Sequence, residues 1–271
     1  MRCVRCRGER FTKAGSDQQE RQIDRCVVCH RRQTERSTSA FSGYRVPDDI
    51  IALTVRWYLR FRLSYADVAE LLAERGIHVD PSTIFDWVHH VTPLYQEAAR
   101  PHRHRVGSRW SIDETCLRIA GRWCSAFRAI DEDGQVIDVY LSPTRDTAAA
   151  TAFLTRAIES TKVTRETVTT DRAPIYPSTF AAVLQEVDHV TGKMEQQGIE
   201  RDHQHLKGRT RSMRGFQTTF CAQVICQGHG FIRILCQGFY TICLPVGDPR
   251  VPKVPRLVRA WDELTAVMAA A

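Results

Sequence analysis

Three acidic residues in the middle of the chain have the residue type and the sequence setting of metal ligands. Asp113 lies in a run of alternating polar and apolar residues, Asp171 ends a short β-branched run, and Glu200 lies in the first turn of an expected helix. A carboxylate inside a β-rich core segment costs free energy unless something compensates it. Hard oxygen ligands suit a pair of Mg²⁺ or Mn²⁺ ions, which can stabilise the attacking and leaving oxygens of a phosphoryl transfer. The three residues are therefore a candidate site for two metal ions, although a single acid of this kind is more often a solvated surface group.

The residues that follow Glu200 extend this candidate site along one helix face. His203 and Lys207 lie at i+3 and i+7 from Glu200 in an expected helix over residues 198–214, a spacing that places all three on one face. Lys207 is expected to face a DNA backbone. We therefore count His203 and Lys207 among the candidate catalytic residues. The basic candidates for DNA contact in this part of the chain are Arg172, Arg209 and Arg211.

Four of the ten cysteines form two C-x-x-C pairs near the N-terminus. Cys3 and Cys6 make the first pair, Cys26 and Cys29 the second, and nineteen residues separate the pairs. This spacing is typical of a four-cysteine zinc ribbon, and four thiolates complete the tetrahedral shell of a structural Zn²⁺. The alternative is a set of ordinary buried or surface thiols. Zinc is the better interpretation, because a segment so poor in apolar residues cannot bury a core without a staple.

Two expected helices, over residues 64–75 and 81–92, have the lengths of a helix-turn-helix. Its second helix would enter a DNA major groove. An ordinary helical hairpin is the alternative, and helix length and spacing alone do not separate the two. A basic zinc ribbon directly upstream favours DNA binding. The residues expected to be exposed on the second helix are Ser82, Thr83, Asp86 and His90.

The elements that must position the acids change from period two to helical spacing along the chain. Period-two alternation predicts three successive strands, with Asp113 on the first and facing away from Ile112 and Glu114. The order that results is β-β-β-α-β-α, followed by the helix of Glu200. The expected strands cover residues 110–119, 122–130, 136–141 and 166–170, and the expected helices cover residues 47–60, 147–160, 178–187, 198–214 and 218–240.

Charge and composition favour a nucleic-acid partner. The net charge is +7, the sequence pI is about 9.0, and residues 1–40 carry ten Lys or Arg against five acids. A composition that is 43% apolar and 25% charged is that of a globular protein. No apolar run is long enough to cross a bilayer, and the charged opening residues do not form a signal peptide. The expected location is therefore the cytoplasm, with no membrane role.

A series of motifs occurs in a fixed order along the chain. They are Ser64-Tyr-Ala-Asp-Val-Ala-Glu-Leu-Leu-Ala-Glu-Arg-Gly76, Ser82-Thr-Ile-Phe-Asp-Trp87, Ser111-Ile-Asp-Glu-Thr, Gly121-Arg-Trp, Arg128-Ala-Ile-Asp131, Leu141-Ser-Pro-Thr-Arg-Asp146, Thr170-Asp-Arg-Ala-Pro-Ile-Tyr-Pro177, Ile199-Glu-Arg-Asp-His-Gln-His-Leu-Lys207 and Met213-Arg-Gly-Phe216. In this order they resemble the insertion-sequence-six type of bacterial DDE transposases over about residues 1–230. The chain departs from that pattern at Arg172, where lysine is usual, in the short stretch of 28 residues between Asp171 and Glu200, and in Gln196-Gln-Gly before the glutamate helix.

The resemblance implies an α/β fold, in which an RNase H-like catalytic domain (β-β-β-α-β-α) follows a small zinc ribbon and a helical helix-turn-helix module. The implied boundaries are a ribbon over residues 1–43, a DNA-binding module over 44–100, a catalytic domain over 105–240 and a C-terminal extension over 241–271. In such a fold Asp113, Asp171 and Glu200 would hold two Mg²⁺ or Mn²⁺ ions.

The implied function is cleavage and strand transfer of DNA, with water and then a transposon 3′-hydroxyl as the nucleophiles. The partners would be the terminal repeats and the target DNA, and a homodimer or higher oligomer would process two ends together. A degenerate transposase that only binds terminal repeats is the alternative, favoured by the short stretch before Glu200. A zinc-ribbon transcription factor ranks last, because it leaves the pattern from Asp113 to Lys207 unexplained.

Overall fold

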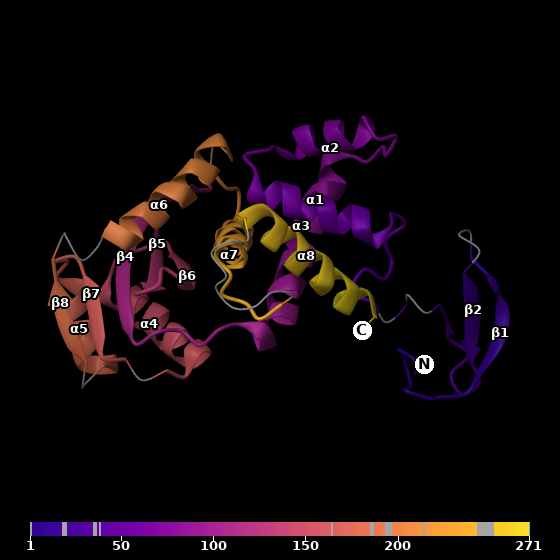
Figure 1. Ribbon diagram of the computed structural model, residues 1–271, viewed down its shortest axis with the longest axis horizontal. Helices are drawn as coiled ribbons and strands as arrows, with labels where there is room; N and C mark the ends of the chain where they lie inside the picture. Colours follow the sequence, from indigo (N-terminus) through magenta and orange to yellow (C-terminus); the bar gives the residue numbers. More distant parts are fainter. Residues whose placement is uncertain are drawn as a thin grey trace.

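The computed structural model describes residues 2–17, 21–34, 37, 39–163, 165–184, 187–192, 197–213, 215–242 and 252–270. Its N-terminal part is a small antiparallel sheet in the order β1-β2-β3, formed by Phe11–Ser16, Gln22–Cys26 and Arg32–Gln33. This ribbon lies apart from the sheet that carries the acids, beyond the C-terminal end of the chain (Figure 1).

A five-stranded mixed sheet forms the centre of the larger part of the molecule. Its order is β6-β5-β4-β7-β8, where β4, β5 and β6 are antiparallel neighbours and β4, β7 and β8 run parallel. Three antiparallel strands come first in the chain, and the two later strands then add in parallel beside β4. This is the RNase H-like arrangement that the resemblance implies. The strands are β4 (Arg109–Ile119), β5 (Arg122–Asp131), β6 (Val136–Ser142), β7 (Thr167–Thr170) and β8 (Asp188–Thr191).

Helices cover both faces of this sheet (Figure 1). α4 (Thr147–Thr161) and α5 (Ile175–Val183) pack on one face, over a core that includes Ile112 and Phe127. α6 (Gln197–Thr210) and α7 (Thr219–Gln237) lie on the other, over Leu117 and Ile119. Odd-numbered residues of β4 therefore face α6, so the predicted direction of Asp113, away from Ile112, is confirmed.

The three N-terminal helices form at the predicted places. They are α1 (Asp48–Arg60), α2 (Tyr65–Ala73) and α3 (Pro81–Ala99). The spacing of Ser64 and Asp67 in the sequence predicts a capping box at the start of α2, and the structure confirms it, because the two residues exchange side-chain to backbone hydrogen bonds. α3 was expected to end near Pro93 but continues six residues beyond it. Tyr95 and Ala99 are fully buried against the neighbouring helices, and this packing outweighs the hydrogen bond that the proline cannot donate.

The same buried cluster joins these helices to α7 and to one face of the sheet. The tail adds α8 (Lys253–Ala270), a helix that period analysis did not predict. Trp261 of α8 is fully buried, stacks on Tyr95 at a ring-centroid distance of 4.0 Å and donates its indole N–H to the Ala52 carbonyl. The C-terminal extension is thus docked where it is described; residues 243–251, which include Cys243, lie outside the described residues.

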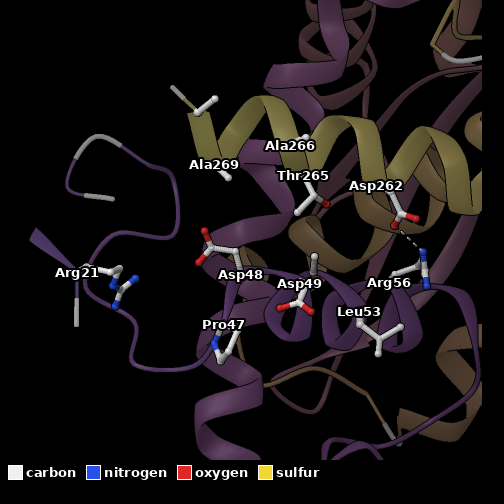
Figure 2. A pocket seen from close by; sticks show the side chains of 12 residues that line it. Arg21, Pro47, Asp48, Asp49, Leu53, Arg56, Asp262, Thr265, Ala266 and Ala269 are labelled. Carbon is white, nitrogen blue, oxygen red and sulfur yellow. Dashed lines mark hydrogen bonds and ion pairs between the residues drawn. The ribbon is translucent and has the colours of Figure 1, made fainter. Parts of the chain in front are cut away.

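α1 and α8 border a groove of about 980 Å³ (Figure 2). An ion pair between Arg56 and Asp262 joins the two helices across it, and Arg21 from the hairpin of the ribbon lies at its other end. None of the predicted site residues lines this groove. No described helix has the length and apolar character needed to cross a membrane.

One further element differs from the prediction. The helix expected over residues 178–187 begins earlier, at Ile175, and ends at Val183, and β8 follows it. All four residues of β8 are exposed, so the strand has no buried apolar face for a sequence pattern to reveal. Residues 185–186 and 193–196, which include Gln196 before the glutamate helix, lie outside the described residues, as does Arg214.

Candidate active site and DNA-binding surfaces

The three acids predicted as metal ligands come together around Asp113. Ligand atoms of Asp113, Glu200 and His203 all lie within 4.8 Å of one another, and so do those of Asp113, Glu114 and Asp171. Asp113 is 8% exposed and is the member shared by both groups. β4 supplies Asp113, the end of β7 supplies Asp171, and α6 supplies Glu200. The fold therefore gathers residues that are far apart in the sequence.

His203 supports the central carboxylate from the α6 side. Its Nδ1 lies 3.4 Å from Asp113 Oδ2, and its side chain is 2% exposed. Its Nε2 atom is buried and has no hydrogen-bond partner in the part of the chain that the structure describes. Lys207, one turn further along the same face, is half-buried. A buried nitrogen and several carboxylate oxygens gathered at one point are a donor set that fits divalent cations such as Mg²⁺ or Mn²⁺.

A fourth acid, Glu114, adjoins this cluster and was not among the predicted site residues. Its Oε1 accepts a 2.7 Å hydrogen bond from the Tyr176 hydroxyl, and its Oε2 lies 3.1 Å from Nη2 of Arg145. Burial raises the pKa of Glu114, while the Tyr176 hydrogen bond and the Arg145 charge oppose that shift. The same Nη2 atom lies 3.1 Å from Asp171 Oδ2. Strand alternation turned Glu114 away from Asp113, so no pattern along β4 pointed to this contact.

The helix that carries Glu200 is anchored by a second buried acid. Asp202 lies between two guanidinium groups: Arg128 of β5, which contacts its Oδ2, and Arg233 of α7, whose Nε is 2.8 Å from its Oδ1. In the register of the sheet, Arg128 on β5 lies directly opposite Asp113 on β4. The sequence contained one usable signal, since Asp202 is the only acid among residues 201–215 and lies beside Leu206 on the helix face opposite the solvent.

The predicted DNA contacts fall into an exposed group and one buried residue. Ser82, Asp86 and His90 are exposed on α3 and Thr83 is half-buried there, while Arg172, next to Asp171, and Arg211, directly after the end of α6, are exposed. The expectation for Arg209 is wrong. Arg209 is 3% exposed, donates to the carbonyl oxygens of Tyr58 and Leu63, and lies over the Tyr58 ring. It is seven residues after Asp202, so it shares the inward face of α6.

The four cysteines of the ribbon converge as their spacing predicts. Their Sγ atoms all lie within 4.8 Å of one another. Each C-x-x-C pair forms the same turn, in which the residue after the second cysteine donates its N–H to the carbonyl of the first and has φ near +60°: Arg7 to Cys3, and His30 to Cys26. Backbone N–H groups, chiefly that of Cys6, lower the pKa of the Cys3 thiol to about 6.

The space around these sulfurs fits a metal site. A Cβ atom on Gly8 would lie 3.4 Å from Cys6 Sγ and 3.5 Å from Cys26 Sγ, so the backbone of Gly8 packs directly against two of the thiols. Four sulfurs at this spacing match the donor set of a structural zinc. Among the described residues, His30 is not a member of this group.

The sequence of this chain is similar to those of known transposases. A family model described as a DDE domain matches residues 107–238, which contain all three acids. The transposase for insertion sequence-like element IS431mec of Staphylococcus aureus is 34% identical over 175 residues, covering 63% of this chain and 78% of that protein. The transposase for insertion sequence element IS257 in transposon Tn4003, from the same species, matches with the same identity and coverage.

Solved structures that match part of this chain include two integrase catalytic cores. The HTLV-2 integrase core in complex with magnesium, in its trimeric form, is 14% identical, covers 59% of this chain and 98% of that one, and has a TM-score of 0.38. The BIV integrase core is 16% identical, and the match covers 59% of this chain and 99% of that one, with a TM-score of 0.37. The family assignment rests on the sequence matches, and by them the chain belongs to the insertion-sequence-six type of DDE transposases, enzymes of DNA transposition.

Proposed function

We propose that Asp113, Asp171 and Glu200 are the acids that carry the chemistry of this transposase, and that its substrates are the terminal repeats of a transposon and a target DNA. The observation that carries the proposal is the convergence of ligand atoms on Asp113, from Asp171 on one side and Glu200 on the other. A merely structural set of surface acids has no reason to converge on one buried carboxylate, because like charges repel.

The roles of the side chains follow from their positions. Asp113 would contribute to both halves of a two-metal site, Asp171 to one and Glu200 to the other. Two divalent ions, Mg²⁺ or Mn²⁺, would supply activation of the attacking oxygen and stabilisation of the leaving oxygen. His203, whose Nδ1 lies 3.4 Å from Asp113 Oδ2, would hold the Asp113 carboxylate in place from the α6 side. Lys207, on the same helix face, would contact a DNA phosphate.

DNA recognition is proposed for the N-terminal half of the chain. The exposed side chains of Ser82, Asp86 and His90 lie on one helix, which suits insertion of α3 into a major groove. The ribbon, with Zn²⁺ bound by Cys3, Cys6, Cys26 and Cys29, would add a basic backbone contact. Arg172 and Arg211 would contact DNA beside the acids. Because two transposon ends are joined in one reaction, we further propose a homodimer or higher oligomer as the working form.

A strand-transfer assay with pre-cut ends tests the catalytic part. Asp171→Asn and Glu200→Gln should each lower the product by at least about a hundredfold in Mg²⁺ or Mn²⁺, because each removes a charged ligand. Asp262→Asn, an exposed acid on α8, is the matched control and should behave like the parent. Equal product from the parent and Asp171→Asn would end the catalytic proposal. A parent that binds terminal repeats but makes no product would favour the degenerate, binding-only transposase.

A further inference from the structure

A chain of three side chains leads from the protein core to Asp171. Tyr176 of α5 donates its hydroxyl to Glu114 Oε1 at 2.7 Å. Glu114 Oε2 contacts Arg145 Nη2 at 3.1 Å, and the same nitrogen contacts Asp171 Oδ2 at 3.1 Å. Glu114 lies on β4, whereas Arg145 lies in the loop between β6 and α4. The contacts thus connect separate parts of the fold to one carboxylate.

The inner end of this chain is held by packing. Tyr176 is fully buried and contacts the Phe180 ring, with a centroid distance of 5.6 Å. The Glu114 side chain is 3% exposed, whereas that of Arg145 is 49% exposed. A half-exposed arginine ordinarily samples many rotamers, and holding it in one costs side-chain entropy. The buried Glu114 offers a fixed anionic partner, so it restricts Arg145 to one position.

Arg145 in turn restricts Asp171. The Asp171 side chain is 36% exposed at the end of β7, where the strand no longer constrains it. Its Oδ1 accepts the Ala173 N–H at 3.0 Å and its Oδ2 faces Arg145, so both oxygens are held. In this orientation Asp171 belongs to the group whose ligand atoms lie within 4.8 Å of Asp113.

We propose that Arg145 is a positioning residue for strand transfer: anchored by Glu114 and Tyr176, it holds the Asp171 carboxylate toward Asp113. This inference rests on the proposed role of Asp171 as one of the catalytic acids. A single nitrogen, Nη2, makes both contacts. A lysine ammonium, which is also one nitrogen with several N–H donors, can therefore replace it in part.

The first test perturbs the network without changing its charge. Tyr176→Phe removes only the hydroxyl that holds Glu114, and Tyr140→Phe, whose ring packs against Arg156, is the same change elsewhere on the domain. Mn²⁺ binding is measured by electron paramagnetic resonance, and strand transfer with pre-cut ends is measured under single-turnover conditions. Tyr176→Phe should weaken Mn²⁺ binding and slow transfer by about tenfold each, the lower range of effects for groups that orient metal ligands. Its KM for DNA ends should stay within about twofold of the parent value.

Two outcomes of this test overturn the inference. A Tyr176→Phe variant that is indistinguishable from Tyr140→Phe in Mn²⁺ affinity and transfer rate would show that the network does not position Asp171. A Tyr176→Phe variant whose whole effect falls on the KM for DNA would instead make Tyr176, Glu114 and Arg145 a DNA contact. Thermal melting of both variants establishes that each is folded.

The second test decides the matter even where Tyr176→Phe folds poorly, because Arg145 is half-exposed. Arg145→Lys should retain at least about ten times the transfer rate of Arg145→Met, since the ammonium can still bridge the two carboxylates. Equal loss in both variants would overturn the inference, because the bridging nitrogen would then not be the part that matters. Asp171→Asn is run beside them. If Asp171→Asn stays active, the proposed function itself fails. If Asp171→Asn is inactive, while Tyr176→Phe behaves like Tyr140→Phe and Arg145→Lys behaves like Arg145→Met, only the role of Arg145 fails.

Discussion

Asp202 anchors the helix that carries Glu200 and His203, and removing its charge has a calculable effect on stability. Its side chain is 3% exposed and lies between Arg128, which is fully buried, and Arg233, which is 20% exposed. Burial alone would raise the pKa of Asp202, but the two guanidinium charges outweigh burial and the net shift is downward. Asp202 is therefore a buried anion with two cationic partners.

Asp202→Asn keeps the size of the side chain but leaves the buried guanidinium of Arg128 and the partly buried guanidinium of Arg233 without a counter-charge. Removing one partner of a buried ion pair costs about 3–5 kcal/mol. A loss of this size in a chain of this length lowers the unfolding midpoint by roughly 2–4 °C for each kcal/mol, or roughly 6–20 °C in all. The fall should be visible in a thermal melt followed by circular dichroism.

The ion pair between Arg56 and the exposed Asp262 provides the control. Asp262 is 66% exposed, and exposed pairs contribute only about 0–1 kcal/mol, so Asp262→Asn should melt close to the parent. Combining Asp202→Asn with Arg128→Met removes the more deeply buried of the two uncompensated charges and should recover part of the loss. An Asp202→Asn variant that melts together with Asp262→Asn would refute the argument that buried charge pairing holds α6 in place.

Three other predictions concern separate parts of the molecule. Burial, reinforced by the Arg128 charge, lowers the pKa of His229 to about 3, whereas an unfolded histidine has a pKa of about 6.5. Between these two pKa values the unfolded chain binds a proton at this histidine and the folded chain does not, so the free energy of unfolding falls as the pH falls through that window. In urea unfolding, His229→Gln should therefore lose about 2 kcal/mol less stability than the parent between pH 7 and pH 5. Equal losses in the two proteins would contradict this. Cys26→Ser should abolish the zinc content measured by elemental analysis, and unchanged zinc would argue against the four-cysteine site. Replacing Ser82 and Thr83 with glutamate should abolish specific binding to terminal repeats in a mobility-shift assay, and unchanged binding would exclude α3 as the recognition helix.

Local patterns in the sequence determined much of the fold. The alternation along β4 set which face carries Asp113, because the side-chain period of a strand is two. The Ser64 and Asp67 spacing determined where α2 begins, and the spacing of the C-x-x-C pairs determined which cysteines converge. Each of these features depends only on residues that are close in the chain or on a repeat within one element.

Tertiary structure decided the features that depend on distant partners. Pro93 does not end α3, because buried neighbours stabilise the turns beyond it, and α8 forms where Trp261 meets Tyr95. Arg209 is buried rather than exposed, because the face of α6 that carries it packs against the carbonyl groups around Tyr58. The bridge from Glu114 through Arg145 to Asp171 joins residues on three different segments. No spacing within one element encodes such contacts, since the free energy of a buried or bridging charge is set by which groups the fold brings beside it.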